Sequence, residues 1–179
     1  MNTIFRLFLL LFLAIVCVAT SHSSLEDDLR IAEKFLDEFY EFNPAGLKAL
    51  LIPGEDAAQV LYYQAWAEAA HYRVKQRNAC VIDKRQTIHC AITVTDDFGL
   101  TMGYEATDTF SLEVVGNKIS AVSFEGDDPP IFEALFEWIS QNRAGVLKGP
   151  CKDLFDGGKT PAACSTAVVA AAKAFMAGP

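Results

Sequence analysis

Apolar residues near the start of the chain recur at steps of three and four positions, which is the period of an α-helix. This face predicts a helix over residues 25–42, which a capping box at Ser23 begins and Pro44 ends. A short helix over 45–51 and a longer helix over 55–72 follow, separated by a Pro-Gly break. The first part of the chain is therefore expected to be helical.

From residue 78 onward the pattern changes to alternation of apolar and polar positions, which is the period of a β-strand. One face is apolar and consists of Ile88, Cys90, Ile92 and Val94. The opposite face carries Thr87, His89, Ala91, Thr93 and Thr95. Strands are expected over 78–83, 87–96, 104–115 and 118–124. A two-residue turn at Gly116-Asn117 joins the last pair, and a loop is expected over 97–103, so the sheet should be an antiparallel meander.

The last part of the chain returns to a helical pattern. A helix with a broad apolar surface is expected over 131–142, capped by the Asp-Asp-Pro-Pro stretch at 127–130. After a loop, Thr160 and Pro161 start an alanine-rich helix. The expected fold class is α+β, with N-terminal helices packed in a curved antiparallel sheet that forms a cone, and a C-terminal helical tail.

Residues 1–24 have the layout of a secretory signal peptide. Arg6 supplies the positive charge, residues 7–19 are apolar, and small polar residues follow. The apolar run is shorter than the roughly 20 residues that a membrane span needs. We expect cleavage after Thr20 and a secreted or periplasmic protein, with an uncleaved N-terminal anchor as the alternative. This divides the chain into a signal peptide over 1–20, a main domain over 21–142 and a C-terminal extension over 143–179.

Cysteine spacing predicts two local disulfides in the exported part of the chain. Cys17 lies within the leader. A hairpin centred on Arg85 would place Cys80 opposite Cys90. The second pair consists of Cys151 and Cys164, which bracket a glycine-containing loop. Zinc binding is the alternative, but the spacing lacks the C-x-x-C knuckle of structural zinc sites.

The composition is acidic, with a formal net charge of -8. This argues against nucleic acids and against anionic membranes, because both bind clustered basic residues. The short basic cluster of Arg73, Lys75 and Arg77 is expected at a solvated helix end. The chain has no phosphate-binding loop, nucleophile elbow or paired-histidine metal motif. We therefore expect no cofactor, no metal ion, no nucleic acid and no stable membrane association after removal of the leader.

Several stretches resemble SnoaL-like members of the NTF2-like superfamily. They are residues 64–72, the first strand with Cys80, residues 92–98, and the run from Phe110 through Asn117-Lys118-Ile119. The resemblance covers about residues 25–142. It implies a cone-shaped fold, and a superfamily that includes ketosteroid isomerases, polyketide cyclases and dehydratases as well as members that only bind or assemble. The catalytic Asp positions of those enzymes cannot be carried over, because no local motif here aligns with them.

The strand pattern nominates Asp108 as a catalytic candidate. Asp108 shares a strand face with Ala106, Phe110 and Leu112, so it points inward if that face is the inner one. A carboxyl group among apolar neighbours has a raised pKa, which is how a general base is tuned. The alternative is that Asp108 lies at the open end of its strand and reaches water.

Four further residues are candidates for ligand binding: Asp96, Tyr104, Trp66 and Tyr62. Asp96 continues the apolar face of its strand, although Asp96 with Gly99 also fits simple turn chemistry. Aromatic residues at helical spacing are equally typical of a core. His71 is expected to cap a helix C-terminus, and His89 to lie on the polar face of its strand.

Three functions fit this sequence. The first is a binding domain that accepts a small apolar ligand or a partner subunit, with a homodimer through the sheet face of Thr87, Thr93 and Thr95. The second is a proton-transfer enzyme of the isomerase, cyclase or dehydratase type that uses Asp108. The third is a cystatin-like protease inhibitor, although residues 113–116 depart from the Q-x-V-x-G hairpin of cystatins. A hollow interior with Asp108 or Asp96 favours chemistry, whereas an interior filled by large aromatic residues such as Trp66, Phe110 and Trp138 favours a binding or structural role.

Overall fold

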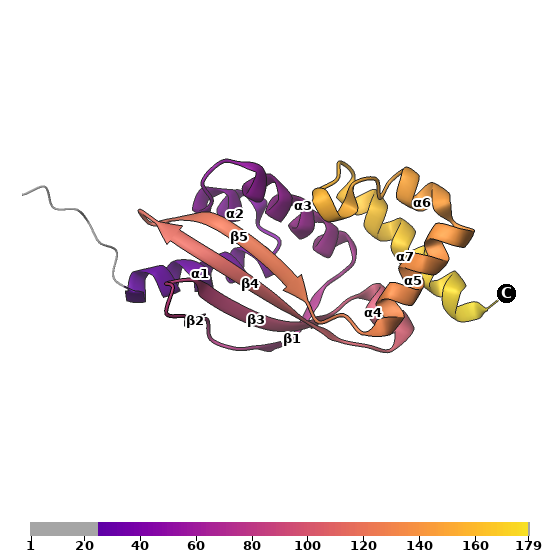
Figure 1. Ribbon diagram of the computed structural model, residues 1–179, viewed down its shortest axis with the longest axis horizontal. Helices are drawn as coiled ribbons and strands as arrows, with labels where there is room; N and C mark the ends of the chain where they lie inside the picture. Colours follow the sequence, from indigo (N-terminus) through magenta and orange to yellow (C-terminus); the bar gives the residue numbers. More distant parts are fainter. Residues whose placement is uncertain (1–24, 179) are drawn as a thin grey trace, which may run out of the picture.

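The computed structural model describes residues 25–178, apart from the side chain of Phe155. The predicted leader, its cleavage after Thr20 and the Ser23 cap lie outside the described residues. The fold is α+β, as predicted, with an antiparallel five-stranded sheet that is not closed. Figure 1 shows the first helices above one face of the sheet and the last helices gathered at one end of the molecule.

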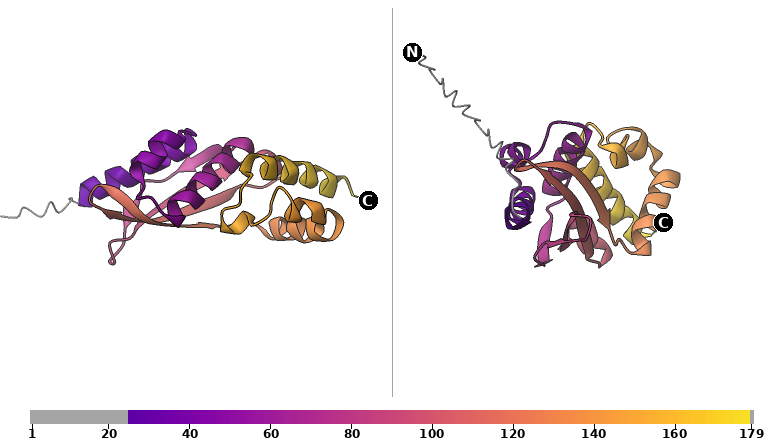
Figure 2. Two further views of the ribbon diagram at one scale, coloured as in Figure 1. Left: turned by 90° about the horizontal axis from the view of Figure 1, so that it is seen from above. Right: turned by 60° about the vertical axis from the view of Figure 1, so that its left-hand side comes forward.

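Three helices precede the sheet, close to the predicted positions: α1 (Leu25–Tyr40), α2 (Pro44–Leu50) and α3 (Glu55–Ala69). The buried face of α1 includes Phe35, Leu36 and Phe39, which the three- and four-residue spacing predicted. These side chains pack on the sheet, which curves around α1 and α3 (Figure 2).

Helix α3 ends at Ala69, three residues earlier than predicted, in a Schellman motif. The His71 amide donates to the Glu68 carbonyl at 3.1 Å, and the Tyr72 amide donates to the Ala67 carbonyl at 3.0 Å. His71 adopts the left-handed conformation that this motif needs, with φ 56°. The predicted position of His71 at a helix C-terminus is therefore confirmed.

The sheet contains β1 (Arg73–Arg77), β2 (Val81–Ile82), β3 (Ile88–Thr95), β4 (Ala106–Val115) and β5 (Lys118–Gly126). Its order is β1-β3-β4-β5, β2 also pairs with β3, and all pairs are antiparallel. The expectation of a helix end at Arg73, Lys75 and Arg77 was wrong, because these residues form the edge strand β1. All five residues of β1 are exposed, so the strand carries no apolar period, and charged side chains protect such an edge from pairing with other chains.

The predicted alternation holds along β3 and β4. Ile88, Cys90 and Ile92 are buried on the inner face of β3, and Phe110 is buried on the same face of β4. Thr95 departs from the pattern, because it is 5% exposed and its hydroxyl donates to the Tyr104 carbonyl at 3.2 Å. The expectation that Thr95 belongs to an exposed sheet face was therefore wrong.

Two stretches that were expected to be loops are helical: α4 (Asp97–Met102) and α6 (Ala144–Lys148). Both are shorter than two turns, so their residues show no recognisable helical period. The remaining elements are α5 (Pro130–Asn142), the 3₁₀ turn η1 (Leu154–Asp156) and α7 (Pro161–Ala177). Helix α5 begins without a side-chain cap, so the predicted capping role of Asp127 and Asp128 was wrong.

The buried apolar residues form two clusters, which we call the sheet cluster and the helix cluster. The sheet cluster joins α1 and α2 to the strands, and the helix cluster joins the end of α3 to α4, α5 and α7. Each cluster contains one disulfide at the predicted pairing, Cys80–Cys90 in the sheet cluster and Cys151–Cys164 in the helix cluster. Between residues 25 and 178, no helix has the length and apolar character needed to cross a membrane.

Candidate functional site

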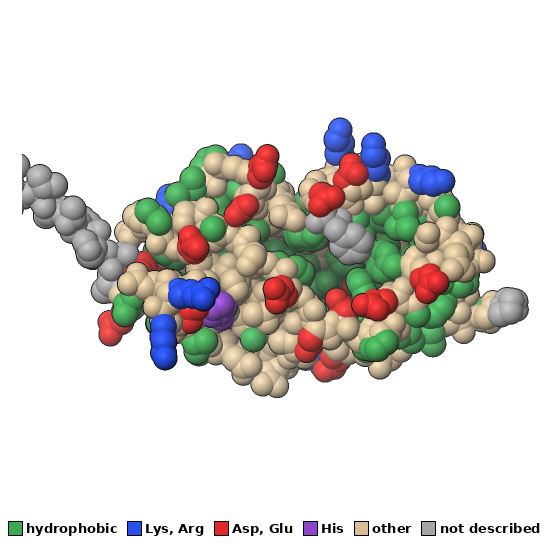
Figure 3. Space-filling view, in the orientation of Figure 1, with side chains coloured by type: hydrophobic (Ala, Val, Ile, Leu, Met, Phe, Trp, Pro, Cys, Tyr) green, Lys and Arg blue, Asp and Glu red, His purple; other side chains and the backbone are tan. Residues whose placement is uncertain are grey.

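A cavity of about 520 Å³ lies where the two clusters meet. Strands β3, β4 and β5 form one wall, and α3, α4 and α5 contribute the others. Figure 3 shows a hollow with apolar side chains inside it and acidic side chains around it. The aromatic lining residues are Phe39, Tyr63, Trp66, Tyr72, Phe98, Tyr104, Phe124, Phe132 and Phe136. The acidic lining residues are Asp96, Asp108 and Asp128.

Asp108 lies on the inner face of β4, as the alternation predicted, and is 4% exposed. The Tyr40 hydroxyl, at the end of α1, donates to Asp108 Oδ2 at 2.9 Å. Gln64 of α3 fixes this end of α1, because its side-chain amide donates to the Glu38 carbonyl at 2.7 Å. Burial raises the pKa of Asp108 to about 7, and the Tyr40 hydrogen bond partly opposes this rise. The carboxyl group therefore changes its charge near neutral pH.

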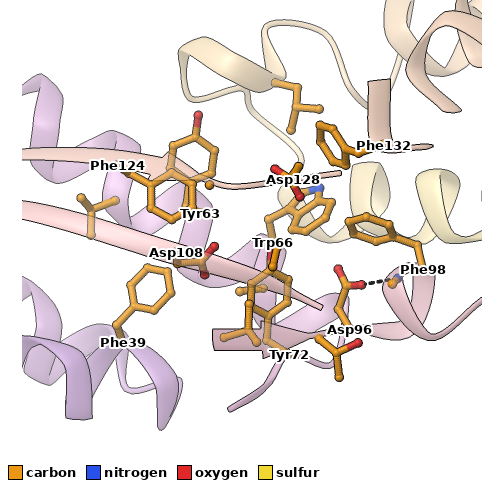
Figure 4. Close-up of a pocket in the computed structure, with 18 of the residues that line it drawn as sticks. Phe39, Tyr63, Trp66, Tyr72, Asp96, Phe98, Asp108, Phe124, Asp128 and Phe132 are labelled. Atoms are coloured by element: carbon orange, nitrogen blue, oxygen red, sulfur yellow. Dashed lines mark hydrogen bonds between the residues drawn. The ribbon is translucent and has the colours of Figure 1, made fainter. Parts of the chain in front are cut away.

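Asp96 lies between β3 and α4 and is 4% exposed. It is the N-cap of α4, since its Oδ1 accepts a hydrogen bond from the Gly99 amide at 2.6 Å (Figure 4). Its other oxygen, Oδ2, is buried and has no hydrogen-bond donor among residues 25–178. Burial raises the pKa of Asp96 to about 7, and the neighbouring Asp97, Asp128 and Asp108 add to this rise.

Asp128, in the segment between β5 and α5, is the third carboxyl group of the lining. Burial and the nearby Asp127 raise its pKa. Gly126 leaves the room that this carboxyl group occupies: a β-carbon at Gly126 would lie 2.9 Å from Asp128 Oδ2 and 4.0 Å from Asp108 Oδ1. The carboxyl group of Asp108, on β4, and that of Asp128, in the segment after β5, therefore approach the same point in the cavity.

Two tyrosines line the cavity next to these acids. The Schellman turn after α3 directs the chain so that Tyr72 lines the cavity, while Tyr104 follows Gly103, which ends α4 with φ 79°. Burial raises the pKa of both tyrosines, and the charges of Asp96, Asp108 and Asp128 raise it further. The Tyr104 hydroxyl and the Trp66 indole nitrogen are buried, and neither has a hydrogen-bond partner in the described part of the chain.

The cavity brings together four of the five residues nominated from sequence: Asp108, Asp96, Tyr104 and Trp66. The fifth, Tyr62, is not among the lining residues and packs in the helix cluster.

His71 and His89 lie outside the lining. The His71 ring contacts Asp97 at 2.7 Å on the surface, and the His89 ring contacts Ser111 at 2.9 Å. Phe110 and Trp138 were named with Trp66 as residues that would fill the interior. Phe110 is buried in the sheet cluster, and Trp138 packs against Phe175.

Two lining residues, Asp128 and Tyr72, were not among the residues predicted for the site. Asp128 was interpreted as part of a helix cap, and Tyr72 as the last residue of a helix. No periodic signal distinguishes either residue, because each lies in a connection between elements whose direction depends on the assembled fold.

No family model and no curated protein matches this chain. Among residues 25–178, no three His, Cys, Asp or Glu side chains are arranged to hold a metal ion. What the arrangement offers is a mostly apolar space, carboxyl groups that titrate near neutral pH, and buried polar atoms without partners.

Proposed function

We propose that the cavity binds a small, largely apolar organic molecule. Its volume of about 520 Å³ falls within the range of roughly 300–1,000 Å³ that is typical of ligand sites. Aromatic side chains dominate the lining, and a few polar groups point into it, which is the usual composition of such sites.

The unpaired buried polar atoms carry this proposal. Asp96 Oδ2, the Tyr104 hydroxyl and the Trp66 indole nitrogen are buried and lack partners among the described residues. A buried polar atom without a partner costs about 1–3 kcal/mol. A ligand with polar groups in the right places would remove part of this cost, so these atoms favour a binding role over simple packing.

A neutral fluorescent probe tests the proposal. N-phenylnaphthylamine is expected to brighten on binding to the chain, because the cavity excludes water. Ala106→Phe places a large side chain on the inner face of β4 beside the cavity and is expected to abolish the signal. Thr109→Phe, on the opposite face of β4, is the matched control and should bind the dye normally. Circular dichroism checks that both variants fold. Absence of binding by the unaltered chain, or equal binding by Ala106→Phe, would contradict the proposal.

A second candidate function is proton transfer by Asp108, and its contact with Tyr40 favours it. A buried carboxylate whose pKa lies near 7 has the basicity of an effective general base at neutral pH. The Tyr40 hydrogen bond holds the carboxyl group in one orientation. Asp108→Asn should abolish turnover of any ketone-like substrate that the chain accepts. Tyr40→Phe should retain turnover with a shifted pH profile, and full activity of Asp108→Asn would exclude this function.

We also propose that the chain has an NTF2-like fold and that it is located in an oxidising compartment. Three helices followed by a curved antiparallel sheet, with a cavity between them, support an NTF2-like fold. The two disulfides support an oxidising compartment outside the cytoplasm.

A further inference from the structure

The charged residues that line the cavity all carry the same sign. Asp96, Asp108 and Asp128 line it, and no Lys, Arg or His of the described residues does so. Buried carboxylates are normally paired with a cation or a set of donors. Here Asp108 receives one hydrogen bond from Tyr40, and Asp96 uses one oxygen to cap α4. The negative charge of the cavity is therefore not compensated by the protein.

The second feature of the site is an unpaired buried oxygen. Asp96 is 4% exposed, and its Oδ2 lacks a donor among residues 25–178. The capping bond from the Gly99 amide fixes the carboxyl group, so Oδ2 cannot turn away without loss of the cap. Asp96 lines the cavity, so this unpaired oxygen lies beside the space that a ligand would occupy.

The aromatic residues around Asp96 form a continuous wall. The ring centroid of Trp66 lies 5.6 Å from that of Phe98 and 5.9 Å from that of Tyr72. The ring centroid of Phe98 in turn lies 6.1 Å from that of Tyr104. The faces of such rings carry partial negative charge and attract organic cations. Carboxylates and aromatic faces thus favour the same kind of ligand.

We propose that the ligand is an organic cation, a hydrophobic amine whose ammonium group lies among Asp96, Asp108 and Asp128 and whose apolar part packs on the aromatic wall. This inference rests on the proposed binding function and specifies its ligand class. The geometry also suits an amine better than a bare metal ion, because the three carboxyl groups are not arranged for metal coordination and an apolar wall offers no oxygen ligands.

Proton linkage follows from this proposal. The pKa of Asp96 and of Asp108 is raised to about 7 in the free chain. The other titratable groups that act on these two carboxyl groups are Tyr40, Asp97, Asp127 and Asp128. Tyr72 and Tyr104 also line the site, and their raised pKa keeps them neutral. A bound cation favours the ionised carboxylates, so binding lowers their pKa and releases protons near pH 6, and amine affinity rises with pH up to about neutral.

Displacement of N-phenylnaphthylamine by three probes tests the inference on the full chain. The probes are naphthylmethylamine, naphthylmethanol and naphthoate, which share one ring system and differ in charge. The amine is expected to bind at least about tenfold more tightly than the alcohol near neutral pH, and naphthoate more weakly than both. Calorimetry in buffers of different ionisation enthalpy should show release of up to about one proton per bound amine near pH 6, and none for the alcohol.

Substitution of the aspartates tests whether their carboxyl groups cause the preference for the amine over the alcohol. Asp96→Asn and Asp128→Asn should each lower the affinity for the amine by about tenfold more than they lower the affinity for the alcohol. Glu125 is an exposed acid on β5 that does not line the cavity. Glu125→Gln is therefore the matched control, and it should change neither the affinity for the amine nor the affinity for the alcohol.

Equal affinity of the amine and the alcohol, or amine binding without proton release, would overturn the cation inference while leaving the binding function intact. If the dye and all three probes fail to bind, the proposed function itself fails. The comparison on the unaltered chain decides between these outcomes even if a variant does not fold.

Discussion

The sheet cluster and the helix cluster use similar aromatic residues for different purposes. In the sheet cluster, Phe35 and Phe110 are fully buried with ring centroids 5.3 Å apart, and they fill the space between α1 and the strands. In the helix cluster, Trp66 and Phe98 border the cavity instead. The difference arises from what the helices pack against. Helix α1 packs on the sheet, whereas α7 packs on α3, α4 and α5. The cavity lies at the boundary between these two kinds of packing, where Phe39 of the sheet cluster also lines it.

Truncation of one aromatic side chain in each cluster should give the largest difference between them. Phe110→Ala leaves a hole in a filled core and is expected to lower the free energy of unfolding by about 3–5 kcal/mol. Phe132→Ala enlarges an existing cavity from a partly buried position and should cost only about 1 kcal/mol. Urea unfolding followed by circular dichroism measures both. Equal losses would mean that the two regions are packed alike.

The disulfides provide the next test. Replacing Cys80 and Cys90, or Cys151 and Cys164, with alanine should lower the free energy of unfolding by roughly 3 kcal/mol in each case, because both close short loops. Only the replacement of Cys151 and Cys164 should also weaken binding of N-phenylnaphthylamine. The reason is that Leu154 lines the cavity and its amide donates to the Cys151 carbonyl at 3.2 Å. Unfolding and dye titrations of both double variants check this, and a loss of dye binding in the first variant would contradict it.

The buried acids predict a smaller effect, on the pH dependence of stability. The folded chain keeps protons on Asp96 and Asp108 up to a pKa of about 7, whereas the unfolded chain releases them near pH 4. The free energy of unfolding should therefore fall as the pH rises from about 4 to 7, by on the order of 2 kcal/mol for each group. Asp96→Asn keeps the capping oxygen and should flatten this profile. An unchanged slope in that variant would mean that Asp96 is already ionised in the folded chain.

The sequence was informative wherever one face of an element is buried against one neighbour. Apolar and polar side chains alternate over residues 88–94 and 108–112 because the sheet has one apolar face. The pairing of the cysteines follows from the register of the neighbouring hairpin, in which Val81 pairs with His89 and places Cys80 opposite Cys90. Strand β1 and helix α4 lack such a signal, the first because it is fully exposed and the second because it is too short.

The candidate site follows the same division. Asp108 could be predicted because a strand fixes the direction of its side chain. Asp128 could not be, because its direction depends on how the chain leaves β5 before Pro129 and on the room left by Gly126. The hollow itself had no sequence signal, since aromatic residues that fill a core and those that line a cavity are the same residue types.

The most direct measurement is an NMR titration of the aspartate carboxyl carbons with and without naphthylmethylamine. The pKa of Asp96 and of Asp108 is expected to lie near 7 in the free chain. With the amine bound, both values should fall below about 6, because a cation stabilises the ionised form. Ordinary values near 4 in the free chain, or raised values that the bound amine leaves unchanged, would contradict the claim that this cavity holds uncompensated carboxylates that select a cation.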